Sequence, residues 1–233
     1  MAKSYPPLKF QADGKDTGVE MQMAIHLADF LQVPLEYRVV EVTTSIGMLQ
    51  SGQIDMIMAA LSTDNSRAQK IWFSEPYLEI TAAALVEKRA LPQTQFGQDF
   101  EDKPIQTIWQ LKQLPDFTFI VKKGTVYESM LQKEFPGKRI ITVASDDEGL
   151  KALLDRRGNG YVQDSVFLEY KHIHTGSLQT SFRLLKGGNR KETIAIGLPF
   201  GASILKNQVD FWIKEAKRKG LINEWLRKFN RVK

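Results

Sequence analysis

The sequence predicts an α/β fold built from two lobes, and three observations lead to this prediction. Short apolar runs that are typical of buried strands alternate with amphipathic segments, which indicates mostly parallel sheets flanked by helices. A polar stretch without clear periodicity, residues 89–104, separates a first set of these elements from a second, similar set. At 233 residues, the chain is long enough for two lobes that each bury a core.

The first lobe is expected to contain alternating strands and helices. Residues 35–40 and 54–61 are apolar runs that predict strands, and residues 43–50 between them predict a helix. Residues 82–87 predict the strand by which the chain leaves this lobe. Gly18 precedes an amphipathic helix whose predicted apolar stripe consists of Met21, Ala24, Ile25, Ala28 and Leu31.

The second lobe is expected to repeat this alternation. Its predicted elements are a strand at residues 117–121, a helix through Met130 and Leu131, a strand at 139–143, a helix at 146–154 and a strand at 161–163. Gly187-Gly188 predicts a turn, and residues 193–198 predict the strand by which the chain returns to the first lobe. We therefore expect lobe 1 to comprise residues 1–87 and 197–233, and lobe 2 to comprise residues 88–196.

The C-terminal segment carries the positive charge of the chain. Residues 206–233 contain nine Lys or Arg and three Asp or Glu, whereas the whole chain has a net charge of +5. An apolar stripe of Val209, Trp212, Ile213 and Ala216 predicts that this segment begins with an amphipathic helix. Because Trp212, Trp225 and Phe229 are assigned to the apolar face and not to a surface that stacks bases, we expect a solvated charged helix face and no nucleic-acid partner.

Composition excludes several other functions. The chain has 42% hydrophobic and 25% charged residues, which is typical of a soluble globular protein. No run approaches the roughly 18 apolar residues that span a bilayer. The absence of cysteine excludes disulfides and thiolate chemistry. The three histidines show no metal-binding spacing, so neither a metal nor a cofactor is expected.

Three charged or polar sites follow the carboxyl ends of predicted strands. Arg67 lies beyond residues 54–61, and its guanidinium could grip both oxygens of a carboxylate, although a solvated surface arginine is an equal alternative. Thr125 opens a helix, whose N–H groups suit an anion. Asp164 ends a strand, where it either caps the next helix or faces a ligand. Because ligands of open α/β sheets bind beyond such strand ends, we expect these residues to face one cleft between the lobes.

The segment around Arg67 resembles a known signature. Its pattern of a hydroxyl residue, T-x-x-x-R and F-S-x-P-Y is similar to that of periplasmic polar amino-acid-binding proteins, the solute-binding proteins of family 3. The matching residues are Ser62, Thr63, Arg67, Phe73, Ser74, Pro76 and Tyr77. The resemblance implies a two-lobed type II periplasmic-binding clamshell that reversibly captures a free α-amino acid between its lobes, without catalysis.

The resemblance also implies roles for individual residues. Arg67 and Ser62 would hold the ligand's α-carboxylate, and Asp164 with the carbonyl of Ala60 would hold its α-ammonium. Thr125 would add its hydroxyl, and Val126, which replaces the family's second hydroxyl, would add only its backbone. Tyr5 would cover the ligand side chain, and Val42 stands where many members have a second aromatic ring. Lys3, Lys122 and Lys123 would favour an acidic side chain unless they are solvated. Ala2 replaces an aspartate of some binders of basic amino acids.

Partners and location follow from the same resemblance. The implied partners are a small-molecule amino acid and either the membrane subunits of an ABC importer or a parent receptor. The protein is expected to be a monomer and to lie in the periplasm or outside the cell after removal of a leader. The family's first strand would end where Met1 stands, so this strand is expected to be shortened. A different class of function, a cyclohexadienyl or arogenate dehydratase, shares the fold. It needs a general acid, for which Asp164 and Glu128 are the candidates.

Overall fold

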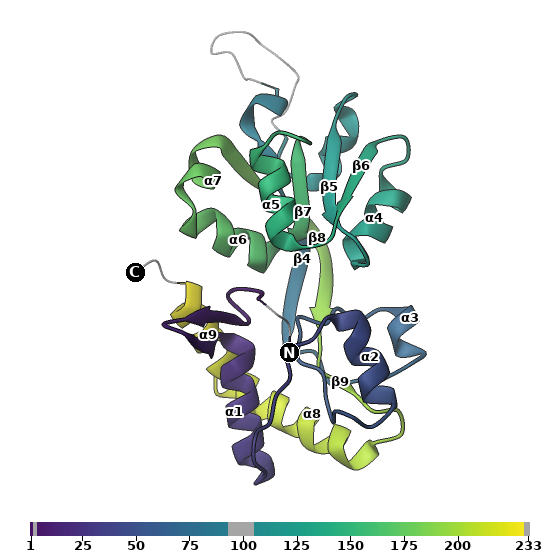
Figure 1. The fold of residues 1–233 in the computed structure, drawn as a ribbon, viewed down its shortest axis with the longest axis vertical. Coiled ribbons are helices and arrows are strands. Elements are labelled where there is room, and N and C mark those ends of the chain that lie inside the picture. The colour runs from purple at the N-terminus through teal and green to yellow at the C-terminus, as the bar shows by residue number, and fades with distance from the viewer. Residues whose placement is uncertain (2–3, 93–104, 231–233) are drawn as a thin grey trace. The chain divides into compact units, whose positions relative to one another are not determined.

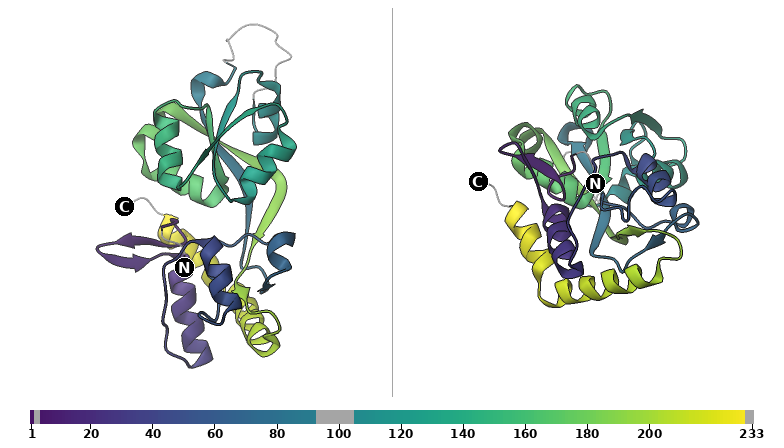
Figure 2. Two further views of the ribbon diagram at one scale, coloured as in Figure 1. Left: turned by 45° about the vertical axis from the view of Figure 1, so that its right-hand side comes forward. Right: turned by 60° about the horizontal axis from the view of Figure 1, so that its bottom comes forward.

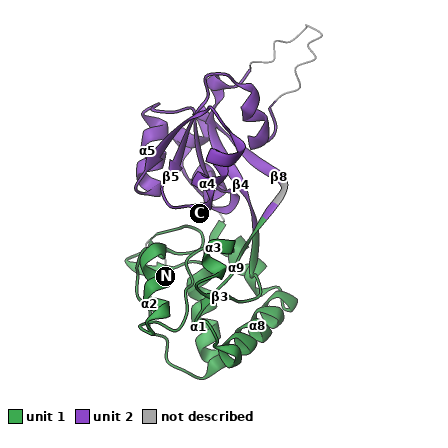
Figure 3. Cartoon of the chain, turned by 90° about the vertical axis from the view of Figure 1, so that its right-hand side faces the viewer, with its two compact units in different colours: residues 1–79, 192–233 green, residues 80–191 purple. Residues whose placement is uncertain are grey.

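The computed structural model describes residues 1, 4–92 and 105–230, and the chain divides into two compact units (Figure 3). Unit 1 consists of Met1–Glu79 and Glu192–Lys233, and unit 2 consists of Ile80–Lys191. Both crossings therefore come earlier in the chain than the boundaries expected from the sequence. The reason is that β4, Leu78–Glu87, pairs along residues 82–86 with the sheet of unit 2, so most of this strand belongs to that unit.

Unit 2 is built on a five-stranded mixed sheet with the strand order β6-β5-β7-β4-β8. Strand β5 runs parallel to β6 and β7, whereas β4 runs antiparallel to β7. The elements are β5 (Thr118–Lys122), α4 (Val126–Glu134), β6 (Arg139–Val143), α5 (Asp146–Leu154), β7 (Gly160–Asp164), α6 (Ser165–His174), α7 (Gly176–Ser181) and β8 (Phe182–Ile194), with 3-10 helices at Lys88–Ala90 and Ile108–Gln113. Helices cover both faces of this sheet (Figures 1 and 2).

Alternation along the strands assigns the two faces of the sheet. Phe119 and Val121 of β5 belong to the main core together with Leu131 of α4, and all three are completely buried. Tyr161 of β7 points to the opposite face and lies against Gly149 of α5. A Cβ on Gly149 would come within 2.3 Å of the Tyr161 ring, so this close packing requires glycine. Helix α5 therefore lies directly against the strands that end in the candidate site.

The turn expected at Gly187-Gly188 is wrong, because both glycines lie inside β8. A Cβ on Gly187 would approach the carbonyl oxygen of Ala82 in β4 to 2.9 Å. Gly187 thus permits close backbone contact within the sheet instead of reversing the chain. The polar crossover expected at residues 89–104 lies mostly outside the described residues.

Unit 1 contains mainly helices, with short two-stranded ladders among its described residues. Helix α1 packs against both α8 and α9. The C-terminal stripe is confirmed, since Val209, Trp212, Ile213 and Ala216 are all buried. The elements are β1 (Phe10–Ala12), β2 (Lys15–Thr17), α1 (Val19–Leu31), α2 (Val42–Gln50), α3 (Asn65–Ala68), β3 (Trp72–Phe73), β9 (Gly197–Leu198), α8 (Ser203–Arg218) and α9 (Leu221–Asn230).

The apolar stripe predicted for α1 is partly wrong. Ile25 is 50% exposed, whereas Met23 and Leu27 are buried. Nδ1 of His26 accepts a hydrogen bond of 2.9 Å from Nε1 of Trp212 on α8. This bond ties α1 to α8.

Two strands expected in the first lobe do not form within the described residues. Residues 35–40 are extended but belong to no described ladder, and Leu35, Tyr37 and Val39 are each about two-fifths exposed. Residues 54–61 are buried over their second half, yet only Ile57 makes an isolated bridge, with Gly197. Ala60 has a φ of 48°, a left-handed conformation that interrupts a strand. Its peptide N–H points to a side-chain acceptor instead of a neighbouring strand.

None of the helices in the described part of the chain is long and apolar enough to cross a membrane.

Candidate functional site

Arg67 is held in place by its own loop. Asp64 caps α3 by accepting a hydrogen bond from the Arg67 backbone N–H at 3.0 Å, and its other oxygen lies 3.1 Å from Arg67 Nε. Arg67 Nη1 donates to the carbonyl of Ser62 at 2.8 Å, and the side chain is 16% exposed. Burial alone would raise the pKa of Asp64, but hydrogen bonds from Ser66 and Arg67 and the guanidinium charge hold it below its usual value. The guanidinium is therefore oriented before any ligand binds.

The residues that precede Arg67 are anchored to the end of β8. Ser62 is 8% exposed and forms a bridge with Ile194. The backbone N–H of Thr63 donates to the carbonyl of Thr193 at 3.0 Å, and the two threonine hydroxyls lie 2.7 Å apart. The loop that carries Ser62 and Arg67 is thus fixed by backbone and side-chain contacts with Thr193 and Ile194 at the end of β8.

A buried carboxylate that the sequence analysis missed supports the same loop. Glu20 on α1 is fully buried, and its Oε1 accepts hydrogen bonds from the N–H of Ala60, at 2.6 Å, and from the hydroxyl of Tyr77. No hydrogen-bond partner of its Oε2 occurs among the described residues. Burial raises the pKa of Glu20, although both hydrogen bonds and the N-terminal charge oppose this shift. Glu20 therefore connects the beginning and the end of the segment from Ala60 to Tyr77.

The two remaining expected residues of unit 1 are positioned differently. Tyr5 is half-buried, and its backbone pairs with Lys9. Val42 is the first residue of α2 and packs, partly buried, against a small apolar cluster. That cluster consists of Leu49, Ile57, Ala59, Leu61 and Ile71. Val42 therefore has a packing role in the structure, and its expected contact with a ligand side chain stays a prediction.

In unit 2, Thr125 caps α4. Its hydroxyl donates to the carbonyl of Lys122 at 2.8 Å and accepts from the N–H of Glu128 at 3.4 Å. The N–H of Gly124 donates to the Glu128 carboxylate at 2.7 Å. No acceptor among the described residues binds the backbone N–H groups of Thr125 and Val126. These two groups and the positive end of the helix dipole suit an anion.

Asp164 performs the capping role that was one of its two expected functions. It ends β7, is 3% exposed, and accepts a hydrogen bond of 2.8 Å from the N–H of Phe167 in the first turn of α6. Its own N–H donates to the side-chain carbonyl of Gln163 at 3.1 Å. The helix cap is confirmed, and contact with a ligand stays a prediction.

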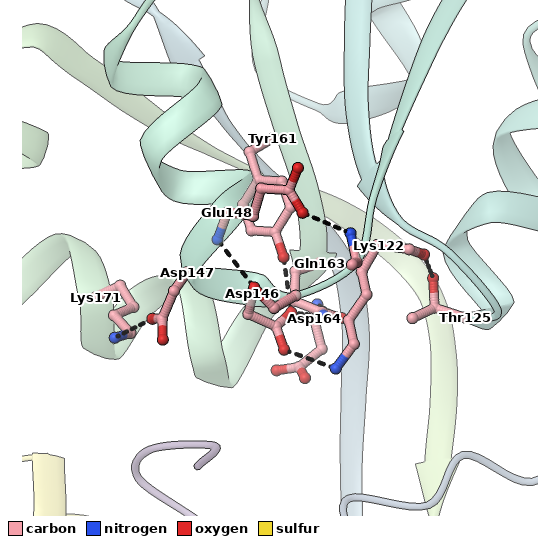
Figure 4. Close-up of polar contacts among 11 residues, drawn as sticks. Lys122, Thr125, Asp146, Asp147, Glu148, Tyr161, Gln163, Asp164 and Lys171 are labelled. Carbon is pink, nitrogen blue, oxygen red and sulfur yellow. Dashed lines mark hydrogen bonds and ion pairs between the residues drawn. The ribbon is translucent and has the colours of Figure 1, made fainter. Parts of the chain in front are cut away.

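A polar network beside Asp164 was also missed by the sequence analysis (Figure 4). Asp146, the first residue of α5, accepts hydrogen bonds of 2.7 Å from Tyr161 and from the side-chain amide of Gln163. Its second oxygen lies 3.1 Å from Lys122 Nζ. Burial and the nearby Asp146 charge raise the pKa of Tyr161 well above its ordinary value, so its phenol remains a donor. Lys122 is therefore paired and not a solvated lysine.

The described residues do not contain a cluster of three or more histidine or acidic side chains placed to hold a metal ion.

An α/β chain of two units, with an oriented arginine in one and a buried carboxylate at a strand end in the other, has the features of a solute-binding protein. The chain belongs to the bacterial extracellular solute-binding proteins, family 3, whose sequence profile matches residues 1–232. This membership confirms both the resemblance and the type II periplasmic-binding fold that were expected from the sequence.

Individual relatives agree with this assignment. The chain is 28% identical to the L-cystine-binding protein TcyJ of Escherichia coli over 144 residues, which cover 61% of this chain and 49% of TcyJ, so the match spans about half of that relative. It is 22% identical over 225 residues to the glutamine-binding protein GlnH of Bacillus subtilis, covering 95% of this chain and 76% of GlnH. A crystal structure of the ancestral amino-acid-binding protein AncCDT-1, a precursor of cyclohexadienyl dehydratase, matches with a TM-score of 0.79 and 25% identity over 98% of this chain and 92% of that one.

Proposed function

We propose that this protein reversibly binds a free α-amino acid and that Arg67 and Asp164 take opposite ends of the ligand. The observation that carries the proposal is the orientation of Arg67 by Asp64 and Ser62, because a fixed guanidinium can bind both oxygens of a carboxylate. The family membership and the amino-acid-binding relatives support the same ligand class.

The other expected residues complete one proposed site. Ser62 and the N–H groups of Thr125 and Val126 assist Arg67 in holding the α-carboxylate. The carbonyl of Ala60 assists Asp164 in holding the α-ammonium. Tyr5 and Val42 contact the ligand side chain.

The proposed setting is the one described for the family, whose members are extracellular solute-binding proteins. We infer a periplasmic or extracellular location and delivery of the amino acid to the membrane subunits of an ABC importer or to a parent receptor. The proposed working form is a monomer.

The proposed activity is binding without catalysis. The alternative function to test is that of a dehydratase, because AncCDT-1 is described as a precursor of cyclohexadienyl dehydratase. A dehydratase requires a proton donor, and each of the two candidate acids accepts a hydrogen bond with one of its carboxylate oxygens. Asp164 accepts the Phe167 N–H, and Glu128 accepts the Gly124 N–H. Incubation with prephenate and with arogenate, followed by product detection, should give no turnover.

Asp164→Asn provides the test of the proposed function. The wild-type protein is first screened with the twenty amino acids by thermal shift, and the best ligand is titrated by calorimetry. In Asp164→Asn, the bound ammonium loses its counter-ion, so the affinity for the amino acid should fall by about one hundredfold or more. The matching α-deaminated acid should lose far less affinity, because Arg67 still holds its carboxylate.

The same variant separates binding from helix capping. Asparagine caps helices about as well as aspartate, so the melting temperature should hardly change. Unchanged affinity for the amino acid would show that Asp164 is a cap alone. An equal loss for the amino acid and the deaminated acid would show general damage to the site and would contradict the assigned role.

A further inference from the structure

The ion pair of Lys122 and Asp146 lies at the carboxyl ends of the strands that carry the proposed ligand contacts of unit 2. Lys122 ends β5, Asp146 begins α5, and their charged atoms are 3.1 Å apart. The side chain of Lys122 is 26% exposed and that of Asp146 is 9% exposed. The aspartate is therefore largely out of water, whereas the lysine side chain is partly exposed.

Hydrogen bonds connect this pair directly to Asp164 and Thr125. The amide of Gln163 donates to Asp146 and its carbonyl accepts from the N–H of Asp164, so one side chain joins the two acids (Figure 4). The carbonyl of Lys122 accepts from the hydroxyl of Thr125. Since Val121 pairs with Val162 in the parallel ladder, Lys122 is next to Gln163 in the sheet. Lys122 thus lies between the residues proposed to hold the amino-acid backbone.

The charge of Lys122 is already paired without a charged ligand side chain. Lys122 and Asp146 neutralise each other. The carboxylate of Glu128 accepts the Gly124 N–H, and Asp147 is 89% exposed, 3.9 Å from Lys171. Lys123 is exposed. In the proposed function, Asp164 is balanced by the ligand's own α-ammonium.

We propose that the Lys122–Asp146 pair makes the site selective for amino acids with uncharged side chains. The inference rests on the proposed function and names the ligand class of the same site. A cationic side chain is repelled by the Lys122 ammonium. An anionic side chain attracts Lys122 away from Asp146 and leaves that buried carboxylate without its counter-ion, which is costly. A neutral side chain disturbs neither charge, so the acidic ligand first associated with Lys122 is disfavoured.

Calorimetric titration with glutamine, glutamate and arginine, which have side chains of similar length, tests the proposal. The wild-type protein should bind glutamine at least about tenfold more tightly than either charged amino acid. Lys122→Met leaves Asp146 without its counter-ion and should raise the affinity for arginine relative to glutamine by about tenfold or more. The double variant Lys122→Met with Asp146→Asn removes both charges and should return the ratio toward the wild-type value.

Lys112→Met is the matched control, because it removes one ammonium from another ion pair of unit 2, that with Glu134 at the far end of α4. Its ligand ratios should equal those of the wild type. A wild type that prefers glutamate or arginine overturns the proposal, as does an unchanged ratio in Lys122→Met. If the double variant shifts as far as the single variant, charge is not the cause and the proposal also fails. If the wild type binds no amino acid at all, the proposed function fails. If it binds amino acids but without preference for uncharged side chains, only the selectivity proposal fails.

Discussion

Replacing Glu20 should destabilise unit 1. The loss depends on whether the new side chain can still accept the hydrogen bonds from Ala60 and Tyr77. In Glu20→Ala, the N–H of Ala60 and the hydroxyl of Tyr77 both lose their buried acceptor. An unsatisfied buried donor costs about 1–3 kcal/mol, so the two together should lower the free energy of unfolding by about 2–6 kcal/mol. Glu20→Gln keeps an oxygen in the position of Oε1 and should cost far less.

The pH dependence of this effect has a defined sign. Burial raises the pKa of Glu20 above its ordinary value of 4.5, so the folded protein binds this proton more tightly than the unfolded chain does. The contribution to stability is complete below pH 4.5 and is lost as the pH rises through the raised pKa. Glutamine does not titrate. Glu20→Gln should therefore gain stability relative to the wild type as the pH increases from 4.5 into the neutral range.

Urea unfolding at several pH values, followed by circular dichroism, measures this difference. Asp16→Asn in the same unit is the control, because the ion pair with Lys9, 2.8 Å long, lowers the pKa of Asp16. Its contribution should be present at neutral pH and lost as the pH falls through that lowered pKa, the opposite direction. Parallel stability curves for the wild type and Glu20→Gln, or a loss below about 1 kcal/mol in Glu20→Ala, would refute the reasoning.

Two further substitutions address each unit separately. Gly149→Ala places a Cβ 2.3 Å from the Tyr161 ring and should destabilise unit 2 by about 1–3 kcal/mol in chemical unfolding, and a variant as stable as the wild type would contradict the close packing. Arg67→Ala should weaken amino-acid binding by roughly thirty- to several-thousand-fold with an unchanged circular dichroism spectrum. Near-wild-type affinity in calorimetry would remove Arg67 from the proposed site.

Much of unit 2 could be predicted from the sequence because its signals are local. Arg139–Val143 and Asp146–Leu154 were predicted with the bounds that the structure has. The apolar run that marks the strand, and the apolar spacing and capping residue that mark the helix, each lie within a few positions in the sequence.

The errors occurred where partners are distant in the chain. The apolar pattern of residues 54–61 correctly indicated burial, but a strand also needs a neighbour. Among the described residues, this segment makes a single bridge, between Ile57 and Gly197. At Gly187-Gly188, sheet pairing with close backbone contact prevailed over turn chemistry.

The residues of the candidate site show the same contrast between local signals and distant partners. The positions of Arg67 and Asp164 next to secondary-structure ends were visible in the sequence. Glu20 and Asp146 were not, because the groups that they bind are 40 and 57 residues away for Glu20, and 24, 15 and 17 residues away for Asp146. An acidic residue within an apolar helical stripe, as at Glu20, is the signal that could have revealed a buried carboxylate.

The discontinuity of unit 1 imposes an order on its folding. Ile57 and Trp72 find their backbone partners in Gly197 and Leu198, more than a hundred residues further along the chain. Unit 2 is one continuous segment that lies between these partners in the sequence. Its contacts therefore close shorter loops than the pairing of the two parts of unit 1 does. By sequence separation alone, the pairing within unit 1 is the slower step.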